Sequence, residues 1–102
     1  MGMDLVPHNP HPDHPKDYCG HPESIGHNWS GWARLVNLLN RLDIDTSDFK
    51  GVNDQEVIPE AKCLEVYDVI KQVWNIRLTQ EERDWLKYRI ELWRTCGGWE
   101  QW

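Results

Sequence analysis

The clearest fold signal in this chain is the stretch TQEERDWLKYRIELWRTCGG, residues 79–98. Thr79 and Glu82 form a capping-box pattern, in which each side chain accepts a hydrogen bond from a free amide at a helix start. Apolar residues then recur at helical spacing, and Gly97 can adopt the left-handed conformation that ends many helices. The pattern predicts one helix over residues 80–96, with a buried face made of Trp85, Leu86, Ile90, Leu92 and Trp93.

Two earlier stretches show the same periodicity. The segment HNWSGWARLVNLLNRLD, residues 27–43, predicts a helix over 30–42 that Asn28 or Ser30 can cap. The segment PEAKCLEVYDVIKQVW predicts a helix over 59–75, because proline suits the first helical position, where an amide hydrogen has no partner. Residues 56–58 can add a short extended pairing. We therefore predict an all-α fold, a small three-helix domain.

Residues 1–27 differ in composition from the rest of the chain. They hold all five histidines and five of the six prolines, and they show no hydrophobic period. Such composition is typical of an irregular segment rather than a helix or strand. We expect an irregular Pro/His-rich arm over residues 1–27 and a helical domain over residues 28–102.

The arm raises the question of a metal site. His8, His11 and His14 recur every three residues, which in a polyproline II helix would place their rings about 9 Å apart. Zinc ligands must all lie about 2.0–2.3 Å from one ion, so a straight arm cannot use all three. A better zinc set is Cys19, His21 and His27 with His14, although no C-x-x-C pair is present. We expect no cofactor, with zinc as the alternative.

Little else in the chain indicates catalysis. Three unevenly spaced cysteines suggest no disulfide framework and are expected to be reduced. Cys63 lies on an apolar helix stripe, where we expect a buried and inert thiol. Cys96 lies in the last turn of a helix, where the dipole raises a thiol pKa. The nucleophile elbow, phosphate-loop and H-E-x-x-H motifs are absent from the sequence, so we expect a binding protein rather than an enzyme.

The net charge of the chain indicates which class of macromolecule it could bind. The formal net charge is −6, and no part of the chain is net basic. Binding to a phosphate backbone needs clustered Lys and Arg, so nucleic acid is disfavoured and a basic protein partner is favoured. No apolar run approaches the roughly 20 residues of a membrane span. The start MGMDLVPHNP has no signal-peptide pattern, so we expect a cytoplasmic protein without a membrane partner.

Seven tryptophans are the remaining functional signal. Most should pack in the core, but tryptophan is also enriched at binding hot spots. Our candidates for binding are Trp29 and Trp32 at a helix start and Trp99 and Trp102 at the chain end. Of the last two, we expect Trp99 in the core and Trp102 at its rim. The prediction is a non-catalytic interaction module that binds another protein. The alternatives are a small-ligand or nucleotide-binding protein with an aromatic-lined pocket, and a zinc-stabilised protein or small enzyme that uses the arm.

Several short motifs, GHNWSGWARLVNLLNRL, DFKGVNDQEVIPEAKCLEVYDVI and LWRTCGGWEQW, together resemble a loose group of small uncharacterised bacterial and phage proteins. The group shares a Trp-containing helix start, an Asn-Asp turn and a Cys-Gly-Gly-aromatic end. A glycine usually follows the Asn-Asp pair, whereas this chain has Gln55. The resemblance covers about residues 25–102 and implies a shared fold but no activity. A phage or prophage setting would suit interference with a host defence protein.

Overall fold

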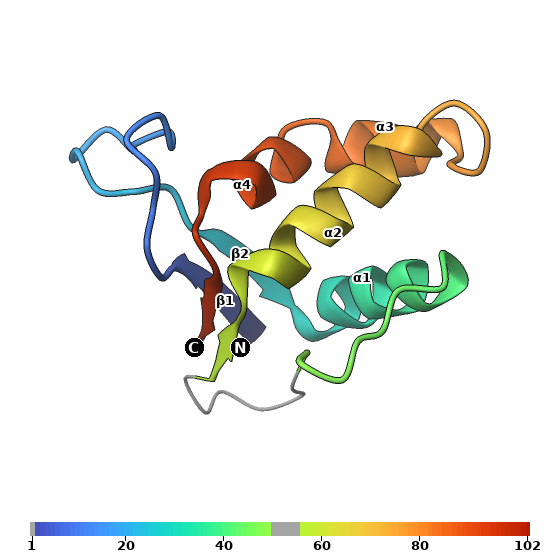
Figure 1. The fold of residues 1–102 in the computed structure, drawn as a ribbon, viewed down its shortest axis with the longest axis horizontal. Helices are drawn as coiled ribbons and strands as arrows, with labels where there is room; N and C mark the ends of the chain where they lie inside the picture. The colour runs from blue at the N-terminus through green and yellow to red at the C-terminus, as the bar shows by residue number, and fades with distance from the viewer. Residues whose placement is uncertain (1, 50–55) are drawn as a thin grey trace.

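The computed structural model describes residues 2–49 and 56–102 and shows helices packed on an antiparallel sheet (Figure 1). This corrects the all-α prediction, since four strands accompany four helices within the described residues. In chain order the elements are β1 Gly2–Pro7, β2 Ile25–Asn28, α1 Trp29–Arg41, β3 Val57–Ile58, α2 Glu60–Gln72, α3 Gln80–Leu86, α4 Arg89–Thr95 and β4 Trp99–Gln101. The Asn-Asp turn at 53–54 and Gln55 lie outside the described residues.

Both ends of the chain lie in the middle of the sheet, whose strand order is β2-β1-β4-β3. β1 pairs with β2 on one side, with Leu5 opposite Ile25, and with β4 on the other, with Leu5 opposite Gln101. The segment predicted to be irregular therefore begins with a central strand. Its residues alternate between buried Met3 and Leu5 and exposed Asp4, which is the period of a half-buried strand.

The expected third helix is divided into α3 and α4, so the three-helix prediction is also wrong. The capping box of Thr79 and Glu82 is present at the start of α3, as predicted. The break falls at Lys87 and Tyr88, which both keep right-handed helical dihedrals. Arg89 donates a side-chain hydrogen bond to the Trp85 carbonyl at 2.9 Å. This carbonyl is the one to which the backbone amide of Arg89 would donate in a continuous helix.

The proline-rich segment after β1 supplies hydrogen bonds to the end of α4. The amides of His8, Asn9 and His11 donate to the carbonyls of Gly98, Cys96 and Thr95 at 2.8, 3.3 and 2.9 Å. Carbonyls at a helix C-terminus have no partner within the helix, so the arm satisfies groups that burial would otherwise leave unpaired. Gly97 permits this approach, because a Cβ there would lie 1.8 Å from the Asn9 carbonyl oxygen.

Aromatic rings link the helices to the sheet. Phe49 stacks on Trp93 with ring centroids 6.0 Å apart, and Trp93 meets Trp99 edge to face at 5.9 Å.

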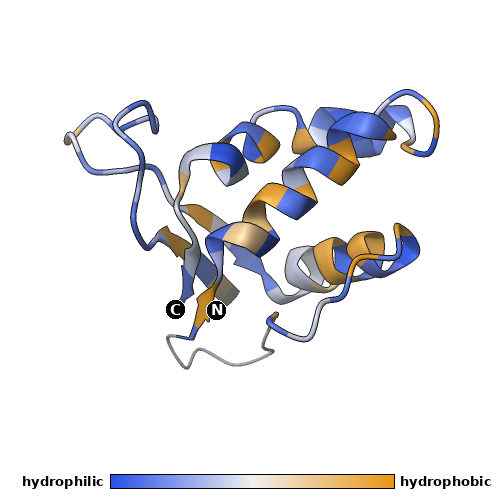
Figure 2. Ribbon diagram, in the orientation of Figure 1, coloured by the Kyte–Doolittle hydropathy of each residue, from blue (hydrophilic) through white to orange (hydrophobic). Residues whose placement is uncertain are grey.

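Figure 2 shows polar and apolar residues alternating along α1 and α2, as expected of helices with one buried face. Among the described residues, no helix combines the length and apolar character that crossing a bilayer requires.

Candidate binding face

The four candidate tryptophans fall into two pairs. Trp32 and Trp99 are buried in the core, whereas Trp29 and Trp102 are 41% and 43% exposed. The prediction that Trp99 packs in the core and Trp102 lies at its rim is confirmed by these exposures. Because a partner can reach only the exposed pair, Trp29 and Trp102 remain as candidates for binding.

Trp102 lies on the side of the sheet that points away from the helices. Along each strand the inward residues are buried, among them Leu5, Ile58 and Trp99. The alternate residues point outward, where Asp4, Gly26, Val57 and Trp102 are exposed and Val6 and Glu100 are half-buried. In Figure 1 the helices lie to one side of the sheet. We call these six outward residues the open face: Asp4, Val6, Gly26, Val57, Glu100 and Trp102.

The indole of Trp102 is fixed in place on the open face. Its backbone amide and carbonyl both bond to Asp4, at 2.8 and 2.9 Å, which extends the pairing of β4 with β1. Its ring nitrogen donates to Glu100 Oε1 at 3.1 Å, and the other oxygen of Glu100 lies 3.0 Å from His8 Nδ1. The contacts with His8 and Trp102 lower the pKa of Glu100, so this carboxylate stays ionised. The aromatic surface is therefore pre-organised.

Asp4 lies between Trp102, which follows β4, and Gly26 of β2, which has no side chain. Its partner on β2 is Gly26, where a Cβ would lie 3.2 Å from Asp4 Oδ1. The Asp4 carboxylate accepts no hydrogen bond from any residue that the structure describes. An exposed indole beside two carboxylates is an arrangement suited to a cation, since the ring face and the charges attract it together.

Sequence reasoning missed Asp4 and Glu100 as functional candidates. The signal for Asp4 was the two-residue alternation of Met3, Asp4 and Leu5, which marks a strand with one exposed face. Glu100 gave no signal of its own, because its role depends on the pairing of β4 with β1.

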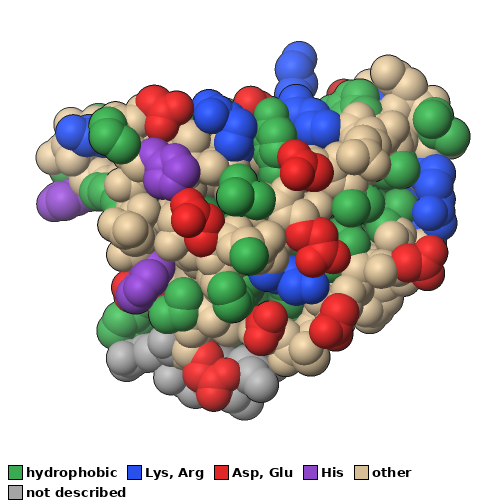
Figure 3. Space-filling model, viewed as in Figure 1, with side chains coloured by type: hydrophobic (Ala, Val, Ile, Leu, Met, Phe, Trp, Pro, Cys, Tyr) green, Lys and Arg blue, Asp and Glu red, His purple; other side chains and the backbone are tan. Residues whose placement is uncertain are grey.

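The histidines of the arm contact three different parts of the fold. His8 pairs with Glu100 at 3.0 Å and His11 with Glu60 at 2.6 Å. Figure 3 shows histidine side chains beside acidic ones on this side of the molecule. His14 is buried: its Nε2 donates to the Glu23 carbonyl at 2.9 Å, and its Nδ1 is hydrogen-bonded to the Thr95 hydroxyl at 2.8 Å. The three histidines of the repeat thus make three separate contacts within the fold.

The alternative zinc set is spread over different environments. Cys19 and His21 are exposed in the turn that the Lys16–Pro22 bridge closes, whereas His14 and His27 are buried. His27 packs between the rings of Trp32 and Trp85. Over residues 2–49 and 56–102, no three His, Cys, Asp or Glu side chains are grouped to hold a metal ion.

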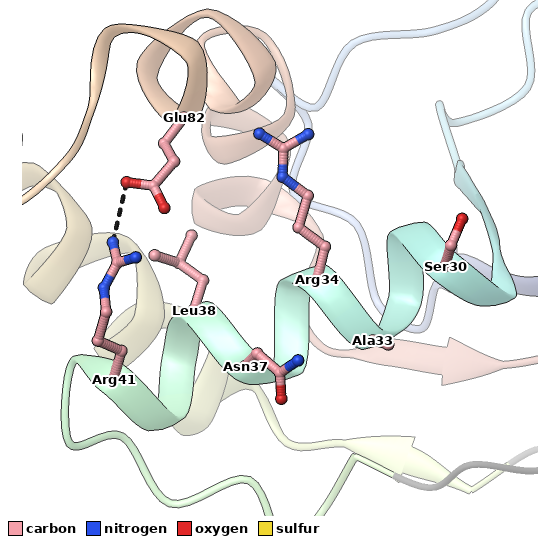
Figure 4. A pocket seen from close by; sticks show the side chains of 7 residues that line it. All are labelled: Ser30, Ala33, Arg34, Asn37, Leu38, Arg41 and Glu82. Carbon is pink, nitrogen blue, oxygen red and sulfur yellow. Dashed lines mark hydrogen bonds and ion pairs between the residues drawn. The ribbon is translucent and has the colours of Figure 1, made fainter.

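A groove of about 520 Å³ lies between α1 and α3 (Figure 4). Arg41 crosses it to bond Glu82 at 2.8 Å, a contact that lowers the Glu82 pKa and raises the Arg41 pKa. Arg34 pairs with Glu81 at 3.3 Å and lies 4.6 Å above the ring of Trp85. Both arginines of the groove are thus paired with carboxylates of α3. Its lining residues are Ser30, Ala33, Arg34, Asn37, Leu38, Arg41 and Glu82.

A second hollow, of about 360 Å³, lies where α2 approaches α3 and contains one aromatic side chain, Trp74. Arg83 is tied to the Leu78 carbonyl at 2.8 Å and Lys71 to Glu91 at 2.9 Å. Lys87 has no acidic partner among the described residues. The lining residues are Lys71, Trp74, Asn75, Gln80, Arg83, Asp84 and Lys87, so basic side chains outnumber acidic ones in the hollow. Comparison with family models, curated proteins and solved structures finds no match for this chain.

Proposed function

We propose that this chain is a non-catalytic interaction module that binds a basic segment of a partner protein on its open face. The observation that carries the proposal is the half-exposed Trp102, fixed by Glu100 and adjacent to the unbonded carboxylate of Asp4. A fixed aromatic ring beside free charge provides affinity at little cost in side-chain entropy.

An arginine side chain of the partner fits this face best. Its planar guanidinium can stack on the indole of Trp102 while donating two hydrogen bonds to Asp4. Val6 and Val57 can contact the apolar stem of the same or a neighbouring side chain, since both lie opposite Glu100. The net charge of −6 would speed the approach of a basic partner.

The biological setting is part of the same proposal. The resemblance to small bacterial and phage proteins, together with the acidic charge, supports a cytoplasmic protein that binds a basic host protein, including a defence protein. A partner that itself binds nucleic acid would offer the arginines that the open face requires.

A direct titration tests the binding chemistry. The ¹⁵N-labelled chain is titrated with an arginine-rich peptide while the indole N–H signals are followed, with the Trp102 signal assigned by its loss in Trp102→Ala. We expect the Trp102 signal to shift and Asp4→Asn to weaken binding several-fold. Ile76→Ala is the matched control, because Ile76 is 81% exposed on the loop between α2 and α3. A peptide that moves other signals and leaves Trp102 unchanged would rule out the open face.

Affinity capture from the native host then tests the partner. A protein counts as the partner only if Trp102→Ala loses it, Ile76→Ala retains it, and added salt weakens its capture. If every captured protein survives the Trp102 substitution, the interaction uses another surface.

The hollow beside Trp74 favours a second candidate, a small anionic ligand such as a nucleotide. Lys71, Arg83 and Lys87 surround it, and an aromatic ring could stack on a base. Calorimetric titration with adenosine monophosphate tests this. Binding that Trp74→Leu and Lys87→Gln abolish and that Trp102→Ala leaves intact would support the small-ligand function.

The third candidate is a zinc-stabilised protein or a small enzyme that uses His14, Cys19, His21 and His27. We expect elemental analysis of chelator-free protein to find no stoichiometric zinc. About one zinc per chain, lost in Cys19→Ser, would favour the metal candidate instead.

A further inference from the structure

The sheet ends at β2, so one side of this strand has no neighbouring strand among the described residues. Backbone groups along an antiparallel strand point alternately to its two sides. Asp4 exchanges both of its backbone hydrogen bonds with Trp102, on the β4 side. Its neighbours in β1 therefore point toward β2, where they pair with Ile25 and His27. Gly26 lies between these two residues, so its amide and its carbonyl point away from the sheet.

A groove of about 220 Å³ lies between this edge and α4. One wall consists of three consecutive residues at the start of β2, and the other of residues at the start of α4: Ser24, Ile25, Gly26, Tyr88, Arg89 and Leu92. A strand edge is where extended peptides bind as an added strand, through main-chain hydrogen bonds. Because Gly26 has no side chain, a second backbone can approach closely there.

The positive charge in the groove belongs to Arg89. Its guanidinium is fixed, since Nη1 donates to the Trp85 carbonyl at 2.9 Å and the group lies 5.3 Å from the Trp85 ring. Its Nε is buried without a hydrogen-bond partner, and no carboxylate pairs with it, over residues 2–49 and 56–102. A fixed guanidinium without an acidic partner favours a carboxylate, which it can bind through two parallel hydrogen bonds.

We infer that the free edge of β2 receives an extended segment of a partner protein as an additional antiparallel strand, with an acidic side chain of that segment bound to Arg89. The residue opposite Gly26 exchanges two backbone hydrogen bonds with it. The side chain of this residue points to the same side as Gly26, which is the open face. Its two neighbours in the segment point toward α4, where a carboxylate can meet Arg89.

The identity of the residue opposite Gly26 rests on the proposed function: it is the arginine that binds Asp4. Asp4 Oδ1 would lie 3.2 Å from a Cβ on Gly26, so the carboxylate leans over the glycine toward the free edge. An arginine of the added strand can therefore extend across Gly26 to reach it. A second copy of this chain fits less well, because Ile25 and His27 flank Gly26 and bring no carboxylate to Arg89.

The test uses the full-length ¹⁵N-labelled chain and the acetylated and amidated peptide Val-Glu-Arg-Glu-Val. We expect the hydrogen exchange of the Gly26 amide to slow when the peptide binds. Replacing both glutamates of the peptide by glutamine should weaken binding about tenfold, because the hydrogen bonds to Arg89 then lose their charge. An N-methyl group on the arginine nitrogen removes the donor to the Gly26 carbonyl, so this peptide should not bind.

Arg89→Gln should weaken binding of the glutamate peptide to the level of the glutamine peptide, and should leave the affinity of the glutamine peptide unchanged. Arg94→Gln is the matched control, because Arg94 also lies on α4 but pairs with Asp13 outside the groove. If Arg89→Gln does not fold, the comparison of the peptides on the wild-type chain gives the same decision.

The added strand and the proposed function can fail separately. If the Trp102 indole signal shifts while Gly26 exchange is unchanged and the N-methylated peptide binds equally well, the added strand is wrong and the proposed function stands. If Gly26 is protected and Arg89 is required but Trp102 and Asp4 play no part, the added strand stands and the proposed function is wrong. Protection of Gly26 that grows with protein concentration, without peptide, would assign the edge to a second copy and overturn the inference.

Discussion

His14 Nδ1 lies 2.8 Å from Thr95 Oγ1, so a residue of the proline-rich arm is hydrogen-bonded to the last residue of α4. Its other nitrogen donates to the Glu23 carbonyl at 2.9 Å, which ties the arm back onto itself. The imidazole is only 4% exposed and meets the edge of Trp99. The hydrogen bond to Thr95 therefore lies where water cannot replace it, and the bond to Glu23 is half-buried.

His14→Ala should lower the free energy of unfolding by about 2–4 kcal/mol, because it leaves the buried Thr95 hydroxyl and the half-buried Glu23 carbonyl without their partner. His11→Ala is the matched control. His11 also contacts a partner, Glu60, but both side chains are largely exposed, so we expect a loss of at most about 1 kcal/mol. Urea unfolding of the two variants checks the difference. Equal losses would show that the arm is attached mainly by its backbone.

Gly97→Ala should be among the most damaging single-methyl additions. Gly97 has φ +65°, and the added Cβ would overlap the Asn9 carbonyl oxygen at 1.8 Å, forcing the arm away from α4. Gly20→Ala provides the control, because φ there is +84° but nothing lies within 4 Å of the added Cβ. Gly20→Ala should cost only the backbone strain, about 1–2 kcal/mol. Thermal melting should place Gly97→Ala well below it; similar melting temperatures would mean that the arm yields easily.

The helices could be predicted from the sequence because their signals are local. Residues 30–42 and 59–75 were predicted from apolar spacing and lie close to α1 and α2. The division of the last helix was missed, because neither a glycine nor a proline marks it in the sequence at Lys87 and Tyr88.

The sheet could not be predicted in the same way. β3 is two residues long and β4 three, too short for a periodic pattern, although the extended pairing expected at 56–58 is confirmed as β3. β1 pairs with β4 across the whole length of the chain, and no local pattern reveals such a contact. The same holds for the open face. Trp102 could be proposed from its residue type, but Asp4 becomes its neighbour only through the pairing of β1 with β4.

The two tryptophans assigned to the last helix should differ in their contribution to stability, although the sequence places both on one face. Trp93 is 2% exposed and contacts Phe49 and Trp99, so Trp93→Ala should cost about 3–5 kcal/mol. Trp85 is only partly buried, with the guanidinium groups of Arg34 and Arg89 at 4.6 and 5.3 Å from its ring. Trp85→Ala should therefore cost clearly less. Urea unfolding of both variants measures the difference, and a larger loss for Trp85 would reverse the assignment.

His27 is the group that should make this fold sensitive to mild acid. It is 7% exposed between Trp32 and Trp85, and its Nε2 is buried without a hydrogen-bond partner among the described residues. Its pKa is lowered from 6.5 to about 4, mainly by burial and then by the charge of Arg89, with Asp4 opposing the shift. The folded state therefore resists a proton that the unfolded state accepts.

This difference fixes the sign of the pH effect. The stability linked to neutral His27 is fully present above pH 6.5 and is lost as the pH falls toward about 4, because only the unfolded chain is protonated in that window. The full effect is about 3 kcal/mol. The lowered pKa values of Glu82 and Glu100 act in the same direction, but only below the ordinary glutamate value of 4.5. Over the interval from pH 6.5 to 5 the effect of His27 is thus separate from that of the two glutamates.

His27→Phe should flatten the dependence of stability on pH in that interval, because phenylalanine fills the space between the two indoles and takes up no proton. Its stability at pH 7 should be close to that of the parent, since the substitution also removes the unpartnered nitrogen. His21→Gln is the control: His21 is exposed, so the slope should stay as in the parent. Urea unfolding at half-unit steps of pH measures all three chains. If the parent and His27→Phe lose stability in parallel between pH 6.5 and 5, the acid sensitivity lies elsewhere, and His27 is a packing residue alone.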